Sequence, residues 1–230
     1  MRKLSAALLA CMLFLTKPGI LIADAISIGM ETTAVSMEEE KTILENIHLQ
    51  VLQGVGQKSE IRCFDVSENG NVAIGTGWAS QESIYVYDLN GKFLYGFAFE
   101  YDGVYGIELR NEQLDIFFLR GNVLVTYDAE GNCQGIQKIA ETNQNYESVK
   151  KLLNRTDKTV LGKHYALERN WNIGDSYSKL TVTDEHGAKT IFYDTSPQHS
   201  FGQIILIVLL IGFLGFVFWG CIQKGAKDQR

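Results

Sequence analysis

Residues capable of metal or acid–base chemistry are scattered along this chain rather than grouped. The four histidines lie far apart, with no H-x-x-x-H pair and no cysteine at ligand spacing: His48, His164, His186 and His199. The sequence holds no G-x-S-x-G elbow and no Walker-type loop. Two glycine pairs begin a dinucleotide-binding pattern, Gly54-Val55-Gly56 and Gly75-Thr76-Gly77, but Ser59 and Ser80 stand where the third glycine belongs. We therefore expect no catalytic residue, no metal site, no cofactor and no enzymatic activity.

Two short motifs contain part of a calcium-binding loop. They are Asp88-x-Asn90-Gly91 and Asp128-x-Glu130-Gly131, and both lack the first carboxylate and the distant bidentate glutamate that complete such a loop. We interpret both as hairpin turns, because glycine supplies the positive φ and aspartate caps the turn.

Two tryptophans are the candidate contacts for a ligand or a partner. Trp78 and Trp171 fall in expected loops, GWASQE and NWNIGDSY, between the second and third strands of their repeat units. An exposed aromatic ring in such a loop can anchor a glycan or a protein. The same ring can instead pack its own loop, and the sequence leaves both roles open.

The elements that would position these loops recur along the chain. Three segments share a β-rich run, then Asp-x-x-Gly, then a second run: SIYVYDLNGKFLYGFAF (83–99), NVLVTYDAEGNCQGIQKI (122–139) and SKLTVTDEHGAKTIFYD (178–194). Their aspartates, Asp88, Asp128 and Asp184, are 40 and then 56 residues apart. Two more strand-like runs precede each of the first two hairpins, and one run, HYALER, precedes the third. We therefore expect each unit to hold four short antiparallel strands.

The longer third spacing contains a predicted helix. In the insertion AETNQNYESVKKLLNRTDK, apolar residues fall at helical spacing after a possible cap at Asn145. We therefore expect a mainly β fold of three four-stranded blade-like units with one short helix near 145–154. Ile84, Leu124 and Leu180, each four residues before its aspartate, should be buried at equivalent positions.

The motifs YDLNGKFLYGF and YDAEGNCQGI resemble the blade repeats of bacterial NHL-type β-propellers. Tyr87-Asp88 and Tyr127-Asp128 match the family pattern, whereas Thr183-Asp184 departs from it at the aromatic position. The resemblance implies a fold and no particular activity. Three units cannot close a ring, so we expect an open or partial propeller whose end sheets present uncovered edges or apolar faces, and hence association with itself or with another protein.

Both ends of the chain indicate a membrane protein. Residues Ile204–Ile222 form nineteen consecutive apolar positions, nearly enough to cross the roughly 30 Å hydrocarbon core. Lys224, Lys227 and Arg230 follow, which places the C-terminus in the cytoplasm. Arg2 and Lys3, an apolar run of twelve residues and Ala23-Asp24-Ala25 form a cleavable signal peptide. A lipobox-like stretch ending at Cys11 is the alternative reading of this N-terminus.

The intervening ectodomain is acidic and poor in cysteine. Residues 26–200 carry 15 Lys and Arg against 25 Asp and Glu, a formal charge of −10, which argues against nucleic acid as a partner. Two of its residues are cysteines, Cys63 and Cys133, and the sequence leaves open whether they pair. So little cysteine favours a bacterial surface protein over an animal receptor.

The sequence thus predicts five segments in a single-pass type I membrane protein. They are a signal peptide (1–25), an acidic segment with a leading strand (26–60), the β-repeat ectodomain (61–200), a transmembrane helix (201–222) and a cytoplasmic tail (223–230). We expect a non-catalytic extracytoplasmic module for protein interaction or ligand binding, held to lipid by one helix. The alternative is an accessory subunit or catalytic propeller of a cell-surface hydrolase or lyase.

Overall fold

The fold consists of three antiparallel β-sheets and two helices. The computed structural model describes residues 29–78, 81–110, 112–169 and 177–195, together with 208, 209 and 211. Among these residues, no helix is both long and apolar enough to cross a bilayer. The predicted signal peptide and cytoplasmic tail, and nearly all of the predicted transmembrane helix, lie outside the described residues.

Each sheet is built on four strands that follow one another in the chain, as the repeats predict. Unit 1 holds β3 (Ile61–Val66), β4 (Val72–Trp78), β5 (Gln81–Tyr87) and β6 (Phe93–Glu100). Unit 2 holds β7 (Tyr105–Arg110), β8 (Gln113–Phe118), β9 (Val123–Tyr127) and β10 (Cys133–Ile139). Unit 3 holds β11 (Asp157–Val160), β12 (Lys163–Glu168), β13 (Lys179–Thr183) and β14 (Lys189–Asp194). None of the three described sheets closes on itself.

The N-terminal segment departs from the prediction of a single leading strand, and the acidic run Glu38-Glu39-Glu40, whose sequence indicates a solvated helix start, lies in the first turn of a helix. The segment forms β1 (Thr32–Ala34), α1 (Met37–Ile47) and β2 (Gln50–Val51). Strand β1 extends unit 2 beyond β10, and β2 extends unit 1 beyond β6, so two sheets have five strands and unit 3 has four. Helix α1 starts because the Ser36 hydroxyl accepts a hydrogen bond from the Glu39 amide at 3.3 Å, which caps its first turn.

The second helix, α2 (Asn143–Leu153), lies where the insertion predicts it but begins earlier. Its N-cap is Thr142, whose hydroxyl accepts from the Asn145 amide at 3.2 Å. Asn145 is therefore not the cap. It is 1% exposed, and its side chain bonds the backbone of Glu31 and Ala140, which fixes the helix to the segment before β1.

The Asp-x-x-Gly segments are hairpin turns between the third and fourth strands of their units, as expected. Asp88 and Asp184 each accept two backbone N–H groups through Oδ1, and Asp128 accepts the Asn132 amide at 2.7 Å. The backbone hydrogen bond from Lys92 lowers the pKa of Asp88, and the hydrogen bonds from the side chain and the amide of Asn132 lower the pKa of Asp128. Because the carboxylates cap their own turns, the calcium-loop alternative is not needed to explain them.

The glycines of two of these turns provide a matched prediction. Gly131 and Gly187 have φ values of +85° and +82°, so alanine at either should cost about 1 kcal/mol of folding free energy. A Cβ at Gly131 would also lie 2.6 Å from Val51 Cγ2, whereas a Cβ at Gly187 meets nothing within 4 Å. We expect Gly131→Ala to destabilise clearly more than Gly187→Ala in urea unfolding. Equal losses would show that β2 does not pack on this turn.

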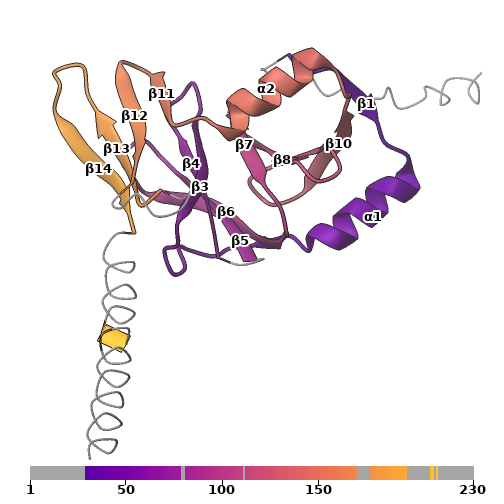
Figure 1. Cartoon of the computed structure of the whole chain (residues 1–230), viewed down its shortest axis with the longest axis horizontal. Helices are drawn as coiled ribbons and strands as arrows, with labels where there is room; N and C mark the ends of the chain where they lie inside the picture. Colours follow the sequence, from indigo (N-terminus) through magenta and orange to yellow (C-terminus); the bar gives the residue numbers. More distant parts are fainter. Residues whose placement is uncertain are drawn as a thin grey trace, which may run out of the picture.

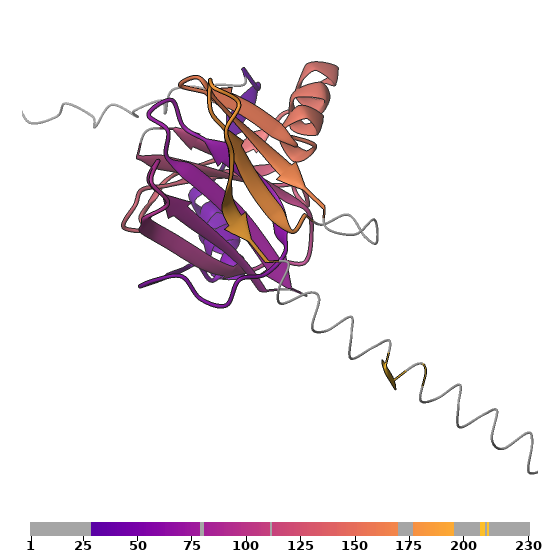
Figure 2. The same cartoon turned by 90° about the vertical axis from the view of Figure 1, so that its left-hand side faces the viewer.

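The units are arranged in space in the order 3, 1, 2, with α2 last (Figure 1). Unit 1 lies in the middle and is buried on both faces. Figure 2 looks onto unit 3, in orange, with unit 1 behind it. On the far side of unit 2, α2 takes the place that a next unit would have.

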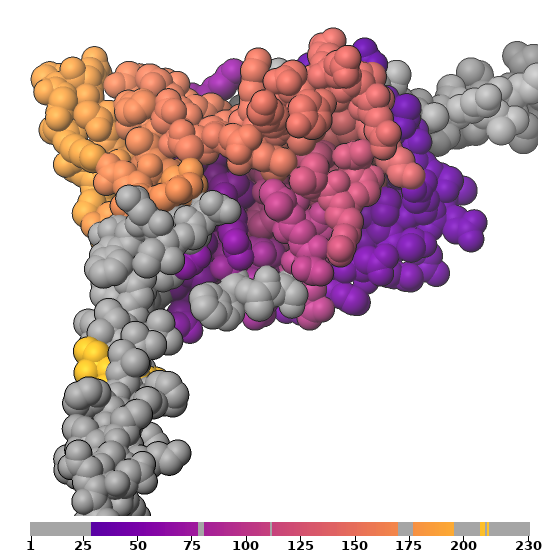
Figure 3. Space-filling view, in the orientation of Figure 1, coloured from indigo at the N-terminus to yellow at the C-terminus, as the bar shows by residue number. Residues whose placement is uncertain are grey.

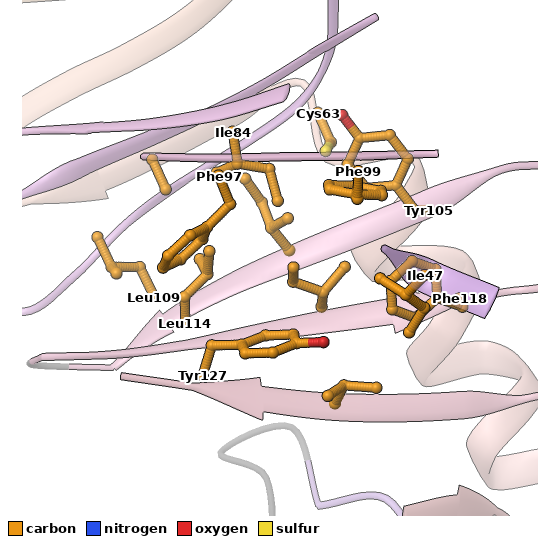
Figure 4. Packing of buried hydrophobic residues seen from close by; sticks show 14 of the residues in the cluster. Ile47, Cys63, Ile84, Phe97, Phe99, Tyr105, Leu109, Leu114, Phe118 and Tyr127 are labelled. Atoms are coloured by element: carbon orange, nitrogen blue, oxygen red, sulfur yellow. The ribbon is translucent and has the colours of Figure 1, made fainter. Parts of the chain in front are cut away.

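Three apolar clusters fill these interfaces. Between units 1 and 2 the cluster includes Ile84, Phe97 and Phe99 from one side and Ile107, Leu114 and Tyr127 from the other (Figure 4). Between units 1 and 3 it includes Phe64, Ile74, Tyr165, Leu180 and Tyr193. Between unit 2 and α2 it includes Phe117, Leu124, Val149 and Leu152.

The predicted equivalence of Ile84, Leu124 and Leu180 is confirmed. They are 0%, 5% and 0% exposed, on the third strand of each unit. Each side chain packs in the apolar cluster that its unit shares with the next element in the spatial order unit 3, unit 1, unit 2, α2. Leu180 faces unit 1, Ile84 faces unit 2 and Leu124 faces α2. The units therefore repeat in orientation as well as in strand order.

The end of this series differs from the uncovered apolar face that we expected. On the face of unit 3 turned away from unit 1, Glu168 pairs with Lys189, and Lys179 lies 3.8 Å from Asp194. This face therefore carries ion pairs, together with the exposed side chain of Ile191. The expected uncovered edge is present in unit 3. Among the described strands, β14 pairs with β13 on one side and with no strand on the other.

Candidate functional site

A buried group of charged residues lies where the first strands of the three units meet. Asp65 on β3 is 0% exposed and accepts three hydrogen bonds. Its Oδ2 accepts from the Leu109 amide of unit 2 at 2.8 Å. Its Oδ1 accepts from Lys158 Nζ of unit 3 at 2.7 Å and from the guanidinium of Arg155, just before unit 3. The Asp65 carboxylate, which belongs to unit 1, therefore links this unit to units 2 and 3.

A second set of polar residues crosses unit 2 beside Asp65. Glu108, Asp115 and Thr126 stand directly opposite one another on β7, β8 and β9. Asp115 accepts from Thr126 Oγ1 at 2.5 Å and from Arg110 Nε at 2.6 Å. The six charged residues Asp65, Glu108, Arg110, Asp115, Arg155 and Lys158 are called the central cluster below.

Glu108 is the member of the central cluster that is poorly satisfied. Its side chain is 7% exposed, and its Oε2 has no hydrogen-bond partner among the described residues. Burial, together with the negative charges of Asp65 and Asp115, raises the pKa of Glu108 to about 7, although Arg155 and Lys158 act in the opposite direction. Glu108 is thus a carboxyl group that exchanges a proton near neutral pH.

A second buried carboxyl lies at the opposite end of units 1 and 2. Glu82 on β5 is 3% exposed and stands opposite Gly77 on β4. A Cβ at Gly77 would lie 1.6 Å from Glu82 Oε2, so the glycine makes room for the carboxyl. Burial raises the pKa of Glu82 to about 7 although Arg62 lowers it. Like Glu108, Glu82 leaves its Oε2 without a partner in the described part of the chain.

Glu82 predicts a pH dependence of stability. Its pKa is higher in the folded protein than in the unfolded chain, so the folded state holds the proton more tightly. This contribution is complete below about pH 4.5 and is lost as pH rises through about 7. We expect Glu82→Gln to remove about 1–3 kcal/mol of the stability difference between pH 5 and pH 8, measured by urea unfolding. An unchanged pH profile would mean that Glu82 is solvated.

The two cysteines of the predicted ectodomain do not pair. Both Cys63 and Cys133 are free thiols, which answers the question of pairing that the sequence left open. Cys63 is 5% exposed, and burial raises the pKa of its thiol far above the ordinary range. A Cβ at Gly75 would lie 2.6 Å from its Sγ, so Gly75 makes room for this side chain. Cys63 acts as a packing residue.

An open groove of about 420 Å³ adjoins the central cluster. It lies between the end of α2 and the start of β11, which adjoin in the space-filling view of Figure 3. Its walls include Lys150, Lys151, Asn154 and Thr156, and Arg155 belongs to both the groove and the cluster. The groove can therefore receive a polar segment from outside.

Trp78, which we expected in a loop, is the last residue of β4, and Trp171 lies outside the described residues. Tyr177, the first described residue after that gap, exchanges backbone hydrogen bonds with Ile61, at 2.9 Å and 3.2 Å. Ile61 is in turn the partner of Thr76 on β4. Tyr177 is therefore separated from β4, the strand that ends at Trp78, by β3.

The sequence analysis did not identify the buried charges. Asp65, Glu82 and Glu108 each interrupt a run of strand residues, IRCFDV, QESIYVY and YGIELR. A carboxylate within a strand-like run was the signal in the sequence that could have indicated a buried ion pair, because carboxylates are seldom buried without a partner. Within the described residues, no group of three or more His, Cys, Asp or Glu side chains is arranged to hold a metal ion.

Comparisons with known proteins return distant structural likenesses and no match in sequence. A scan against protein-family models finds no match, and a search of curated proteins finds none either. Among solved structures, the chain is similar to selenomethionine-substituted virginiamycin B lyase from Staphylococcus aureus, with 14% identity and a TM-score of 0.27. The match covers 63% of this chain and 45% of that one, so this chain spans less than half of its length. At this TM-score the likeness adds nothing to the fold that this chain's own strands define.

Proposed function

We propose that the chain is a single-pass type I membrane protein whose extracytoplasmic β-repeat module binds a protein partner or ligand without catalysis. The observation that supports a non-catalytic role is the use of the central cluster: Asp65 bonds to units 2 and 3, and Arg110 to Asp115. These charges hold the architecture together. The anchor in this proposal is Ile204–Ile222, which follows soon after β14.

Trp78 and Trp171 are the proposed partner contacts. The hydrogen bonds between Tyr177 and Ile61 place Tyr177, six residues after Trp171, one strand away from β4, so we expect one partner to reach both tryptophans. Aromatic side chains at such positions commonly carry much of an interface's binding energy.

Crosslinking tests this role. The native complex would be crosslinked on cells and recovered through a C-terminal tag, from the wild type and from Trp78→Ala, Trp171→Ala and Tyr146→Ala. Tyr146 is a matched control because it is an aromatic residue of α2 that is 67% exposed and distant in sequence from both loops. We expect both tryptophan variants to lose the crosslinked partner and Tyr146→Ala to keep it. Equal recovery from all four proteins would refute the proposed contacts.

The membrane topology is tested separately. Protease added to intact cells or protoplasts should digest residues 26–200 and spare a tag placed after Arg230. Digestion of the tag would overturn the type I orientation.

The alternative function, a subunit or catalytic propeller of a surface hydrolase or lyase, has one observation in its favour. Glu108 exchanges a proton near neutral pH, and its neighbour Arg155 also lines the open groove. A buried carboxyl of this kind can act as a general acid or base if substrate reaches it. At 7% exposure Glu108 does not meet that condition in this structure.

A further inference from the structure

We infer that two exposed leucines, Leu89 and Leu161, form a docking site for an apolar pocket of a protein partner, at the end of units 1 and 3 that lies away from the proposed membrane anchor. These two residues are called the turn patch below. The inference rests on the proposed function for the orientation of the module, and it adds a contact separate from Trp78 and Trp171.

The turn patch joins turns of two units. Leu161 belongs to the β11–β12 turn and Leu89 to the β5–β6 turn, and they are 64% and 47% exposed. Both approach the β3–β4 turn, because a Cβ at Gly70 would lie 3.3 Å from Leu161 Cδ1 and 3.6 Å from Leu89 Cβ. A leucine of unit 3 and a leucine of unit 1 therefore share one apolar surface that is open to solvent.

The backbone of Leu161 has a conformation that disfavours leucine. Leu161 has a φ of +51° and Gly162 a φ of +72°, in a two-residue hairpin turn where asparagine is usual at the first position. A bulky side chain at positive φ is strained. Among the described residues, the other non-glycine positions with positive φ are His48 and Asn122, whose types tolerate it. Because Leu161 is strained and also exposed, its side chain indicates a role in binding.

The place where the chain leaves the module restricts the possible occupants. The β13–β14 turn lies at the same end as the turn patch, because a Cβ at Gly162 would be 3.4 Å from Glu185 Cδ. Strand β14 leads away from that turn and ends at Asp194, about 20 Å further on. The proposed anchor, Ile204–Ile222, follows shortly after. The turn patch then faces away from its own membrane, and two copies in one membrane would present their patches in the same direction instead of to each other.

The surroundings of the turn patch define the chemistry of the partner. The four turns at this end hold four carboxylates, and three lysines lie in these turns or begin the strands that follow: Glu68, Asp88, Asp184 and Glu185, with Lys92, Lys163 and Lys189. An apolar centre with a polar rim is the usual arrangement of a protein interface. The excess of carboxylates disfavours contact with anionic lipid and suits a pocket whose own rim is basic.

Stability and binding should change in opposite directions when Leu161 is replaced. Leu161→Asn relieves the strain at positive φ, so we expect the urea midpoint of the full-length chain in mild detergent to rise by roughly 0.3–0.5 M. Leu119→Asn is the matched control, because Leu119 is 40% exposed in the β8–β9 connection and is not among the described residues with positive φ. Its midpoint should not rise. A midpoint that falls or stays unchanged in Leu161→Asn would show that this leucine serves packing, which would overturn the inference.

Photocrosslinking on intact cells identifies the occupant. A photoreactive phenylalanine analogue would replace Asn90, which is exposed next to Leu89, and the mass of each adduct would be measured. We expect an adduct with another protein that is lost in Leu89→Asn and Leu161→Asn and kept in Leu119→Asn, and support requires this result together with the raised midpoint. No adduct, an adduct with lipid or with a second copy, or equal yields from all variants would overturn the inference. Failure of the proposed topology would be recognised separately, by digestion of the C-terminal tag.

Discussion

Replacing Asp65 with alanine is expected to lower the free energy of unfolding by about 3–5 kcal/mol. The substitution leaves the Leu109 amide without its acceptor and leaves Arg155 and Lys158, both largely buried, without the anion that neutralises them. Removing one partner of a buried ion pair costs more than the pair itself contributes, because the remaining charge stays desolvated. Urea unfolding of the full-length chain, followed by tryptophan fluorescence and circular dichroism, measures the loss.

Asp157→Ala is the matched control for this measurement. Asp157 lies one residue before Lys158 but is exposed at the start of β11, where its carboxylate accepts a long hydrogen bond, 3.4 Å, from Thr156 Oγ1. A surface substitution of this kind should change stability by no more than about 0.5 kcal/mol. Similar losses for the two variants would mean that Asp65 contributes only as an ordinary surface charge.

Phe97→Ala is expected to destabilise the protein by a similar amount, about 3–5 kcal/mol, for an apolar reason. The ring of Phe97 is 0% exposed between units 1 and 2, with ring centroids 5.9 Å from Tyr127 and 5.6 Å from Tyr95 (Figure 4). Alanine would leave a cavity that neighbouring strands cannot close without shifting. The midpoint and slope of urea unfolding provide the comparison.

Leu94→Ala on the same strand separates burial from strand propensity. Leu94 is 43% exposed, so its loss removes little buried area, although alanine is as poor a strand former at this position as at Phe97. We expect a cost below about 1 kcal/mol. A loss at Leu94 comparable to that at Phe97 would show that the interface between units 1 and 2 is not the main source of stability.

The local elements of the units could be predicted because their signals are short-range. Gly91, Gly131 and Gly187 have φ values between +81° and +85°, which L-residues other than glycine rarely adopt, and the preceding aspartates cap the turns. The burial of Ile84, Leu124 and Leu180 followed from the same repeat. Helix α1 was also within reach, because Ser36 and Glu39 form the S-x-x-E pattern of a helix start.

The features that were missed depend on contacts between distant parts of the chain. Asn145 resembles a cap in sequence, but its side chain bonds Glu31, which is 114 residues away. Strands β1 and β2 are three and two residues long and exist because β10 and β6 offer them an edge. The bonds of Asp65 to Arg155 and Lys158 span 90 and 93 residues. No local pattern encodes which distant cation a buried carboxylate will meet.

The order of the units in space, 3–1–2, also has a consequence for synthesis of the chain at the ribosome. Unit 1 emerges first and unit 2 can cover one of its faces, but Phe64 and Ile74 on the other face meet Tyr165 and Leu180 only after about a hundred more residues have been made. Until then the nascent chain exposes an apolar sheet surface, and such intermediates are prone to aggregate. Completion of the core must wait for the segment made just before Ile204–Ile222. Folding of this domain is therefore completed only once unit 3 has been made, and a pause in synthesis between units 2 and 3 would be its most vulnerable moment.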